Sequence, residues 1–190
     1  MKILAVDTTS TMFTAVLIDG EKTISTSLEV GKSGHSSLIL PTINELMDMA
    51  DVKPQDLDGV SVVVGPGSFT GIRIGVSAMT AIAYGTGAKR VAVNSFELLA
   101  YNRENALCAI DAGHGHNYVA KVENGKIVSM DFVEAKDSAT LPDDTVTTTS
   151  CSATETLDKV VREKWANGEF VNVFEPFYMR KSQAERNNEI

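Results

Sequence analysis

The first candidate for chemistry is the polar turn Asp7-Thr8-Thr9, which directly follows the apolar run 3–6. A carboxylate, hydroxyl groups and the backbone amides of a turn can together bind phosphate or a hydrated metal ion. The same residues can also bond only to one another, with Asp7 accepting hydrogen bonds from the turn amides. We favour this second, simpler interpretation.

A second candidate is the glycine-rich motif GPGSFTGIRIG at residues 65–75. Amides at the start of a helix favour anions, so Gly65 and Gly67 could cradle a phosphate group. We favour a packing role for Gly71 and Gly75, because a missing side chain lets the following helix lie close to a sheet. A phosphate or nucleotide site at these two places would draw on Asp7, Thr8, Thr9, Gly65, Gly67 and Arg73.

Arg73 is the only charge in the helix expected over residues 69–88. If it is buried it needs a partner, because an unpaired buried charge is costly, and Asp7 or the carbonyls of a helix end are the candidates. A helix this apolar should be covered on more than one side, and a sheet covers only one face. We therefore expect a second covering element.

A third candidate is the cluster Asp111, His114 and His116, because two histidines two residues apart on a strand point to the same side and could share a metal ion. A glycine-rich turn with polar residues explains the pattern as well, and we favour it. His35 begins an expected helix, but Ile39 stands four residues later, where a zinc-binding histidine pair would need its second member. Nothing resembles a nucleophile elbow. We therefore expect neither catalytic residues nor a metal site.

The composition is that of a globular protein: 190 residues, 43% apolar and 22% charged. The formal net charge of −8 leaves no basic surface for gripping nucleic acid unaided, so a partner would supply most of the positive charge. Arg73 and several polar residues argue against a membrane span over 69–88. The N-terminal apolar run meets Asp7 too early for a secretory signal. We expect a cytoplasmic protein without membrane contact.

The order of expected elements appears twice along the chain. The first set comprises strands 3–6, 14–18 and 22–30, helix 35–50, strand 60–64, helix 69–88, strand 90–93 and helix 95–101. The second set comprises strands 107–111, 117–122, 126–133 and 146–149 and helix 154–165. Each set begins with a strand that ends in aspartate and continues into a hairpin. We therefore predict two related lobes, 1–103 and 104–190, of which the second is shorter.

The motif at 65–75 resembles the signature of the bacterial TsaB (YeaZ) family. Supporting matches are ILAVDTT at 3–9, HS at 35–36, LP at 40–41, DA at 111–112 and PFYMR at 176–180. The resemblance is good over 1–112 and thin over 113–173. The family usually continues Asp-Ala-Arg at the start of its second lobe, whereas GHGH follows Asp111-Ala112 here.

The resemblance implies an α/β, actin/Hsp70-like (ASKHA) fold with two ribonuclease-H-like lobes, the second abbreviated. It also implies a non-catalytic subunit of the complex that transfers a threonylcarbamoyl group to the adenosine next to the anticodon of tRNA. The catalytic relative, TsaD, carries a metal-binding H-x-x-x-H on its first helix, where this chain has His35 and Ile39. The implied partners are a TsaD-like subunit, a TsaE-like ATPase and a second copy of this chain. Contact with tRNA would be indirect, and ATP or ADP could bind at the interface of the complex.

We expect partner contact through a bundle of helices 35–50 and 69–88 with the equivalent pair of the partner. The expected contact residues are Leu38, Ile39, Ile43, Met47, Ile72, Val76, Met79 and Ala83. Two other functions remain open, a stand-alone ATPase of the sugar-kinase type and a metallopeptidase-like enzyme. Asp7 and the glycine loop favour the ATPase, and the short second lobe counts against it. The missing histidine pair counts against the peptidase. A purely homodimeric scaffold is a further alternative.

Overall fold

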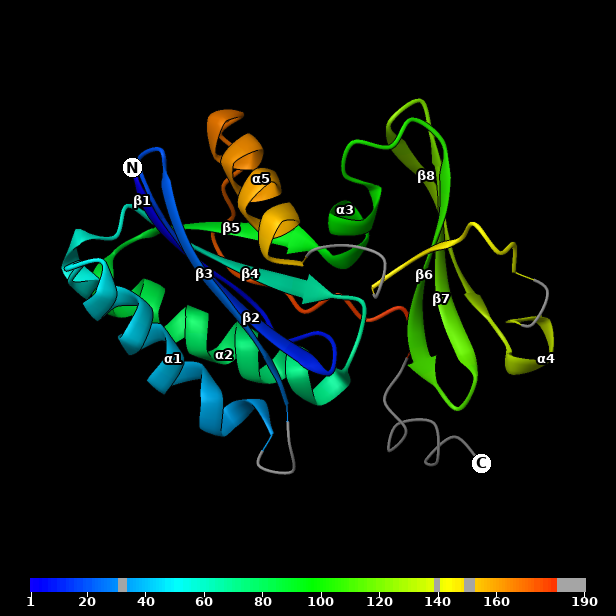
Figure 1. The fold of residues 1–190 in the computed structure, drawn as a ribbon, viewed down its shortest axis with the longest axis horizontal. Coiled ribbons are helices and arrows are strands. Elements are labelled where there is room, and N and C mark those ends of the chain that lie inside the picture. The colour runs from blue at the N-terminus through cyan, green and yellow to red at the C-terminus, as the bar shows by residue number, and fades with distance from the viewer. Residues whose placement is uncertain (31–33, 139–140, 149–152, 181–190) are drawn as a thin grey trace.

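Two mixed β-sheets divide the molecule into two lobes that lie side by side (Figure 1). The computed structural model describes residues 1–30, 34–138, 141–148 and 153–180. The two-lobed α/β fold expected from the sequence is confirmed. Among the described helices, none combines the length and the apolar character that crossing a membrane requires.

The first lobe is built on a five-stranded sheet in the order β3-β2-β1-β4-β5. Its strands are β1 (Lys2–Asp7), β2 (Met12–Asp19), β3 (Lys22–Glu29), β4 (Gly59–Gly65) and β5 (Lys89–Asn94). The first three form an antiparallel meander, while β4 and β5 run parallel to β1. Because β1, β2 and β4 are covered on both faces, they read as nearly continuous apolar runs.

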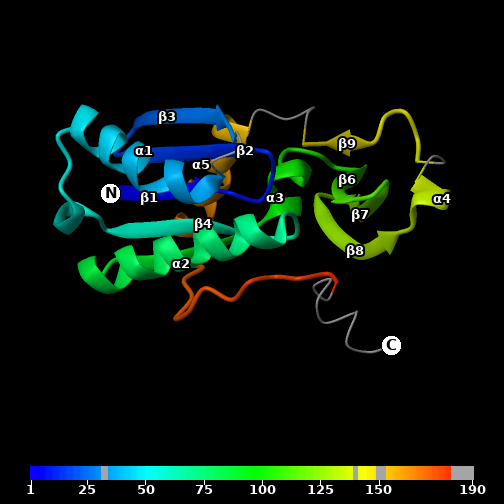
Figure 2. The same ribbon diagram turned by 90° about the horizontal axis from the view of Figure 1, so that it is seen from below.

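Helices cover both faces of this sheet (Figure 2). One face carries α1 (His35–Met49) and α2 (Phe69–Thr86), and the short helix η1 (Pro54–Asp56) precedes β4. Ser68 caps the start of α2, because its hydroxyl oxygen accepts a hydrogen bond from the N–H of Gly71. Gly87, in the left-handed conformation with φ of 73°, ends the helix. The two caps fix where α2 leaves the glycine loop and where it stops.

The second lobe repeats the meander of the first. Its sheet has the order β8-β7-β6-β9, with β9 parallel to β6 as β4 is parallel to β1. Its elements are β6 (Ala106–Gly113), β7 (His116–Glu123), β8 (Lys126–Val133), α4 (Ala135–Ser138) and β9 (Val146–Thr147). The short helix α3 (Ser95–Ala100) lies between the lobes and contributes Phe96 and Leu99 to the core of the second. The repeat inferred from the sequence is therefore present in the topology.

Helix α5 (Ala153–Ala166) corrects the predicted content of lobe 104–190, because it packs on the sheet of the first lobe. Its buried residues Leu157, Val160 and Val161 share a core cluster with side chains of β1, β2 and β5. Arg162 ties the helix to the β2–β3 turn by donating to the carbonyl of Gly20 at 2.7 Å. The predicted boundary near residue 103 falls between α3 and β6, but the chain returns to the first lobe after β9.

Candidate functional site

The turn after β1 is closed on itself. The backbone N–H and the hydroxyl of Thr9 both donate to Oδ1 of Asp7, at 2.8 and 2.7 Å. Burial raises the pKa of the Asp7 carboxyl, although the hydrogen bonds from Thr9 and the charge of His35 act in the opposite direction. These bonds are the ones that the simpler interpretation predicts, and phosphate binding at Asp7 stays a prediction.

The glycine loop packs directly on that turn. The Thr8 hydroxyl donates to the carbonyl of Gly71 at 2.8 Å, and the Ser68 N–H donates to the carbonyl of Thr9 at 2.7 Å. A Cβ on Gly71 or Gly75 would collide with atoms of Thr8. These glycines therefore allow α2 to lie against the end of β1, which confirms their predicted packing role.

Phosphate binding by the amides of Gly65 and Gly67 stays a prediction, but the structure gives both glycines a packing role. A Cβ on Gly67 would collide with the carbonyl oxygen of Thr9, and one on Gly65 would lie 2.5 Å from the carbonyl oxygen of Phe177. Gly65 also has a φ of 116°, which L side chains rarely adopt. A side chain at either position would thus collide with the backbone of the protein itself.

Arg73 is exposed, so the condition under which it would need Asp7 or a helix end as a partner is not met. Its guanidinium lies 4.0 Å from the centre of the Phe69 ring, and its Nε donates to the hydroxyl of Tyr178 at 3.3 Å. Tyr178 in turn stacks on Phe69, with ring centres 4.6 Å apart. No local pattern in the sequence predicts this contact, because Arg73 and Tyr178 are 105 residues apart.

A cleft of about 810 Å³ lies between the lobes. The first lobe lines it with the turn after β1, the glycine loop and His35, and the second lobe with residues around Asp111 and His114. Tyr178 and Arg180 of the C-terminal segment also line it. Of the six predicted phosphate or nucleotide residues, only Thr9 and Gly67 line this cleft.

His35 is the buried histidine of this cleft. It is 7% exposed, its ring meets Phe13 edge-on, and its Nε2 has no hydrogen-bond partner among the described residues. Burial lowers the pKa of His35, while backbone contacts with Met12 and the charge of Asp7 act against that shift. Burial thus favours the neutral form of the imidazole.

The residues proposed as a third candidate have separate partners. Asp111 accepts a hydrogen bond from the N–H of Gly113 at 2.7 Å. His116 accepts from the N–H of Ala135 through Nδ1 at 3.0 Å, and its ring lies 5.1 Å from that of Phe132. His114 occupies the turn with a φ of 57°. These contacts are those of a polar, glycine-rich turn, and among the described residues no group of three metal-ligating side chains occurs.

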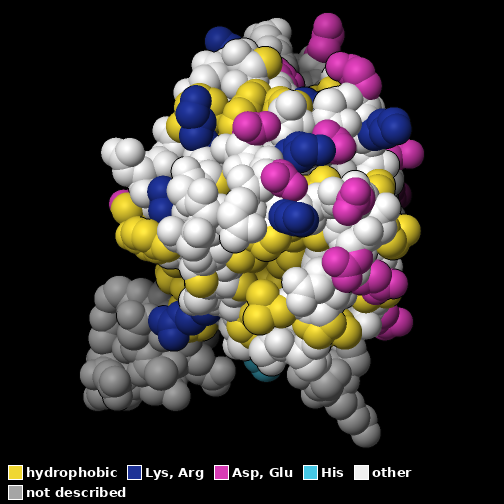
Figure 3. Space-filling model, turned by 90° about the vertical axis from the view of Figure 1, so that its left-hand side faces the viewer, with side chains coloured by type: hydrophobic (Ala, Val, Ile, Leu, Met, Phe, Trp, Pro, Cys, Tyr) yellow, Lys and Arg dark blue, Asp and Glu magenta, His cyan; other side chains and the backbone are white. Residues whose placement is uncertain are grey.

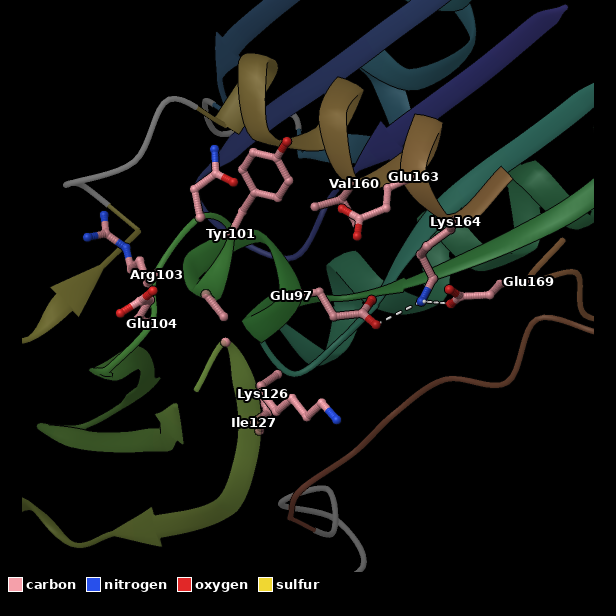
Figure 4. A pocket seen from close by; sticks show the side chains of 13 residues that line it. Glu97, Tyr101, Arg103, Glu104, Lys126, Ile127, Val160, Glu163, Lys164 and Glu169 are labelled. Atoms are coloured by element: carbon pink, nitrogen blue, oxygen red, sulfur yellow. Dashed lines mark hydrogen bonds and ion pairs between the residues drawn. The ribbon is translucent and has the colours of Figure 1, made fainter. Parts of the chain in front are cut away.

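A second cleft, of about 710 Å³, lies on another side of the lobe junction and is strongly charged (Figure 4). Lys164 of α5 is bonded there to Glu97 at 2.7 Å and to Glu169 at 2.9 Å. Burial alone would lower the pKa of Lys164, but the two carboxylates outweigh it, and the pKa is raised. The ion pairs join α5 to α3 and to the segment after α5. We therefore assign them a structural role.

The expected partner-contact residues prove to be core residues. Seven of them are at most 8% exposed and pack between the helices and the sheet, while Leu38 is partly buried. The seven are Ile39, Ile43, Met47, Ile72, Val76, Met79 and Ala83. Apolar periodicity marked the face that meets the sheet, because core and interface use the same residue types. The choice of contact residues is therefore corrected.

The outer face of α1 and α2 nevertheless carries apolar side chains. A shallow groove of about 650 Å³ runs between the two helices, with Leu40 on α1 and Ile74, Ala78 and Ile82 on α2. Leu40 is 53% exposed. Figure 3 shows hydrophobic side chains gathered on the side where the two helices end, with acidic side chains along one flank. We call the four groove residues the outer helix face.

A family model described as "TsaD: tRNA N6-adenosine threonylcarbamoyltransferase" matches residues 29–137. The match covers more than half of the chain, from α1 through the glycine loop and α2 to the meander of the second lobe. The chain belongs to this family. The family resemblance seen in the sequence is thereby confirmed, with members named TsaB as its close relatives.

The tRNA threonylcarbamoyladenosine biosynthesis protein TsaB of Bacillus subtilis (strain 168) is 36% identical over 102 residues, or 54% of this chain and 44% of that protein. TsaB of Haemophilus influenzae is 31% identical over 141 residues, or 70% of this chain and 58% of that protein. The chain thus spans about half the length of these curated relatives. YeaZ from Pseudomonas aeruginosa shares the fold, with a TM-score of 0.77, 22% identity and coverage of 95% of this chain and 99% of that one.

Proposed function

We propose that this chain is a non-catalytic partner subunit in the formation of threonylcarbamoyladenosine on tRNA, and that it binds a TsaD-like catalytic subunit through the outer helix face. Membership of the family and similarity to proteins named TsaB support the pathway. The observation that carries the subunit role is the apolar groove between α1 and α2, in which Leu40, Ile74 and Ile82 are exposed or only half-buried.

The non-catalytic part of the proposal is supported by the first helix. In the H-x-x-x-H pattern of TsaD the second histidine would stand at Ile39, which is 3% exposed and packed in the core. A metal ligand at that position would have to leave the core, so substitution alone would not restore the pair. His35 remains as a buried imidazole, and its burial favours the neutral form. The chemistry is therefore assigned to the partner.

The wider assembly follows from the same proposal. The chain would act in the cytoplasm, contact tRNA only indirectly, and share the complex with a TsaE-like ATPase. Its net charge of −8 supports indirect contact, because phosphate backbones repel an acidic surface. ATP or ADP is assigned to the interface of the complex, and no cofactor is assigned to this chain alone. The outer helix face would also accept a second copy when the catalytic subunit is absent.

The binding test is co-purification with the TsaD-like protein of the same organism. Replacing Ile82 by Glu places a charge in the groove and should abolish binding, because a carboxylate would be buried without a partner. Val128→Glu, at an exposed site on β8 of the second lobe, is the matched control and should bind normally. Binding that survives both Ile82→Glu and Leu40→Glu would refute the proposed surface. Val76, which is 8% exposed, is unsuited to this test because its replacement would disturb the core.

A stand-alone ATPase is the competing function, and the interlobe cleft with the unpartnered Nε2 of His35 is the observation that favours it. The turn at Asp7 counts against it, because the carboxylate oxygen Oδ1 is already bonded to the N–H and the hydroxyl of Thr9. ATP hydrolysis by the purified chain decides between the two. Turnover by the chain alone that disappears in Asp7→Asn would replace our proposal.

A further inference from the structure

The segment from Val171 to Arg180 runs along the edge of the first lobe and continues toward the sheet of the second (Figure 2). We call it the C-terminal strap. It begins with an antiparallel bridge in which the N–H of Val171 donates to the carbonyl of Arg90 at 2.9 Å. Phe174 is 3% exposed in the core beneath α1 and α2. The first part of the strap is thus fixed to the first lobe at two places.

The strap then crosses the glycine loop. The N–H of Phe177 donates to the carbonyl of Val64 at 2.8 Å, and the carbonyl oxygen of Phe177 fills the space that a side chain on Gly65 would need. Tyr178 stacks on Phe69, and its hydroxyl accepts from Arg73. The passage of the strap therefore gives Gly65 a second reason to be glycine, besides its positive φ.

The last two residues of the strap belong to the second lobe. Met179 packs against the core cluster of that lobe, and the Arg180 guanidinium lies 4.5 Å from the centre of the Phe132 ring on β8. A cation over an aromatic ring is an attractive contact. Over the four residues from Phe177 to Arg180, the chain thus passes from the end of β4 to β8.

Helix α3 joins the lobes at another place, since Phe96 and Leu99 are part of the same cluster that Met179 touches. The interlobe cleft is lined by the strap but not by α3. We propose that the C-terminal strap is a clamp that, together with α3, holds the two lobes at one fixed angle and so keeps the interlobe cleft in a single shape. This role is independent of the function proposed above, because it concerns the chain before any partner binds.

The clamp predicts a single distance between the lobes. Double electron–electron resonance between two spin labels would measure that distance. The labels are attached to cysteines that replace Glu21, an exposed residue of the β2–β3 turn, and Val128, which is 53% exposed on β8. Cys151 is replaced by serine in all samples, and Cys108 is buried. We expect one narrow distribution in the otherwise unchanged chain.

Removing the anchors in the second lobe should release the clamp. The double variant Met179→Ala/Arg180→Ala keeps every contact of the strap with the first lobe, and it should broaden the distribution and increase hydrogen exchange in β6–β8 by about tenfold. Val173→Ala is the control, because Val173 lies in the strap but is 57% exposed. It should change neither measurement.

Two results would overturn the proposal: a broad distribution in the unchanged chain, or a double variant as narrow as the control. If the double variant does not fold, as judged by its circular dichroism, Arg180→Ala alone is measured. Met179→Ala alone is measured as well, and an unchanged distribution with unchanged exchange in both single variants would equally overturn the clamp, because neither anchor would then hold the lobes.

Discussion

The two sheets share one strand order but differ in how they are covered. In the first lobe α1 and α2 lie on one face and α5 on the other, and β1, β2 and β4 are buried almost throughout. In the second lobe β8 is mostly exposed, with Val128 53% and Met130 41% accessible. The core of that lobe depends on α3 and Met179, which come from outside its own sheet.

The two lobes thus share a strand topology but differ in how completely their cores are covered. The first lobe has a complete core and borrows α5 from the second half of the sequence. The second lobe keeps the meander but receives its cover from segments that the first lobe positions. We infer that the first lobe can carry a partner surface without the second, whereas the second lobe needs the first to stay folded.

The largest effect that would sharpen this comparison is expected at Leu157 of α5, which is fully buried against the first sheet. Leu157→Ala should lower the free energy of unfolding by about 3 kcal/mol, because it removes apolar contacts and leaves a cavity. Urea denaturation measures the loss. The control Val128→Ala, at an exposed site, should stay within about 0.5 kcal/mol.

Hydrogen exchange in the same variant shows with which lobe α5 unfolds. We expect Leu157→Ala to increase exchange in β1–β3 before β6–β8, because α5 contacts the first sheet. Faster exchange confined to β6–β8 would contradict the assignment of α5 to the first lobe. A uniform increase would mean that the lobes unfold as one unit, which would remove the proposed difference between them.

A smaller effect is expected at Arg162, the residue that fastens α5 to the β2–β3 turn. Its Nε donates to Asp158 at 2.6 Å, and its other nitrogens bond to the Gly20 carbonyl and the Thr23 hydroxyl. Arg162→Ala should cost about 2 kcal/mol, because Asp158 is 8% exposed and would lose its charged partner. Thermal unfolding measures it.

The control for that variant is Lys121→Ala on β7. Its ion pair with Glu123 is exposed, and exposed pairs contribute little, at most about 1 kcal/mol. Equal losses of stability in the two variants would show that charged contacts stabilise both lobes to the same extent. That result would contradict the proposed difference between the lobes.

The sequence was sufficient for features that depend on neighbouring residues. The hairpin turn at Gly20 follows from local chemistry, as do the cap at Ser68 and the helix end at Gly87. The close approach of Gly71 and Gly75 was also inferred correctly, since small residues in an apolar helix indicate a nearby backbone. Family resemblance extended these local inferences to the two-lobed fold.

Features that depend on distant segments were not accessible in the same way. The sequence predicts a helix over 154–165, but nothing local shows that its residue Leu157 packs on the sheet of the first lobe. For α2 the stripe through Val76 predicted burial without distinguishing the core of one chain from an interface between two. The contact of Arg73 with Tyr178 had no periodic signal at all.

The smallest effect on stability is expected at two aspartates, Asp7 at the end of β1 and Asp111 near the end of β6. Asp7 is 8% exposed, whereas Asp111 is an exposed residue of β6. Because the folded-state pKa of Asp7 is raised above 3.8, its contribution to stability is present below that pH and is lost as the pH rises through the folded value. An ionised Asp7 therefore costs stability at pH 7.

Asp7→Asn should raise the free energy of unfolding at pH 7 by at most about 1 kcal/mol and leave it unchanged at pH 3, since the amide still accepts from Thr9 without carrying a charge. Asp111→Asn should have no measurable effect at either pH. Thermal unfolding at the two pH values checks both variants. A loss of stability in Asp7→Asn at pH 7 would mean that the carboxylate is held by more than Thr9. The ionised carboxylate of Asp7 would then stabilise the first lobe, and its burial alone would no longer explain why Asp7 and Asp111 differ.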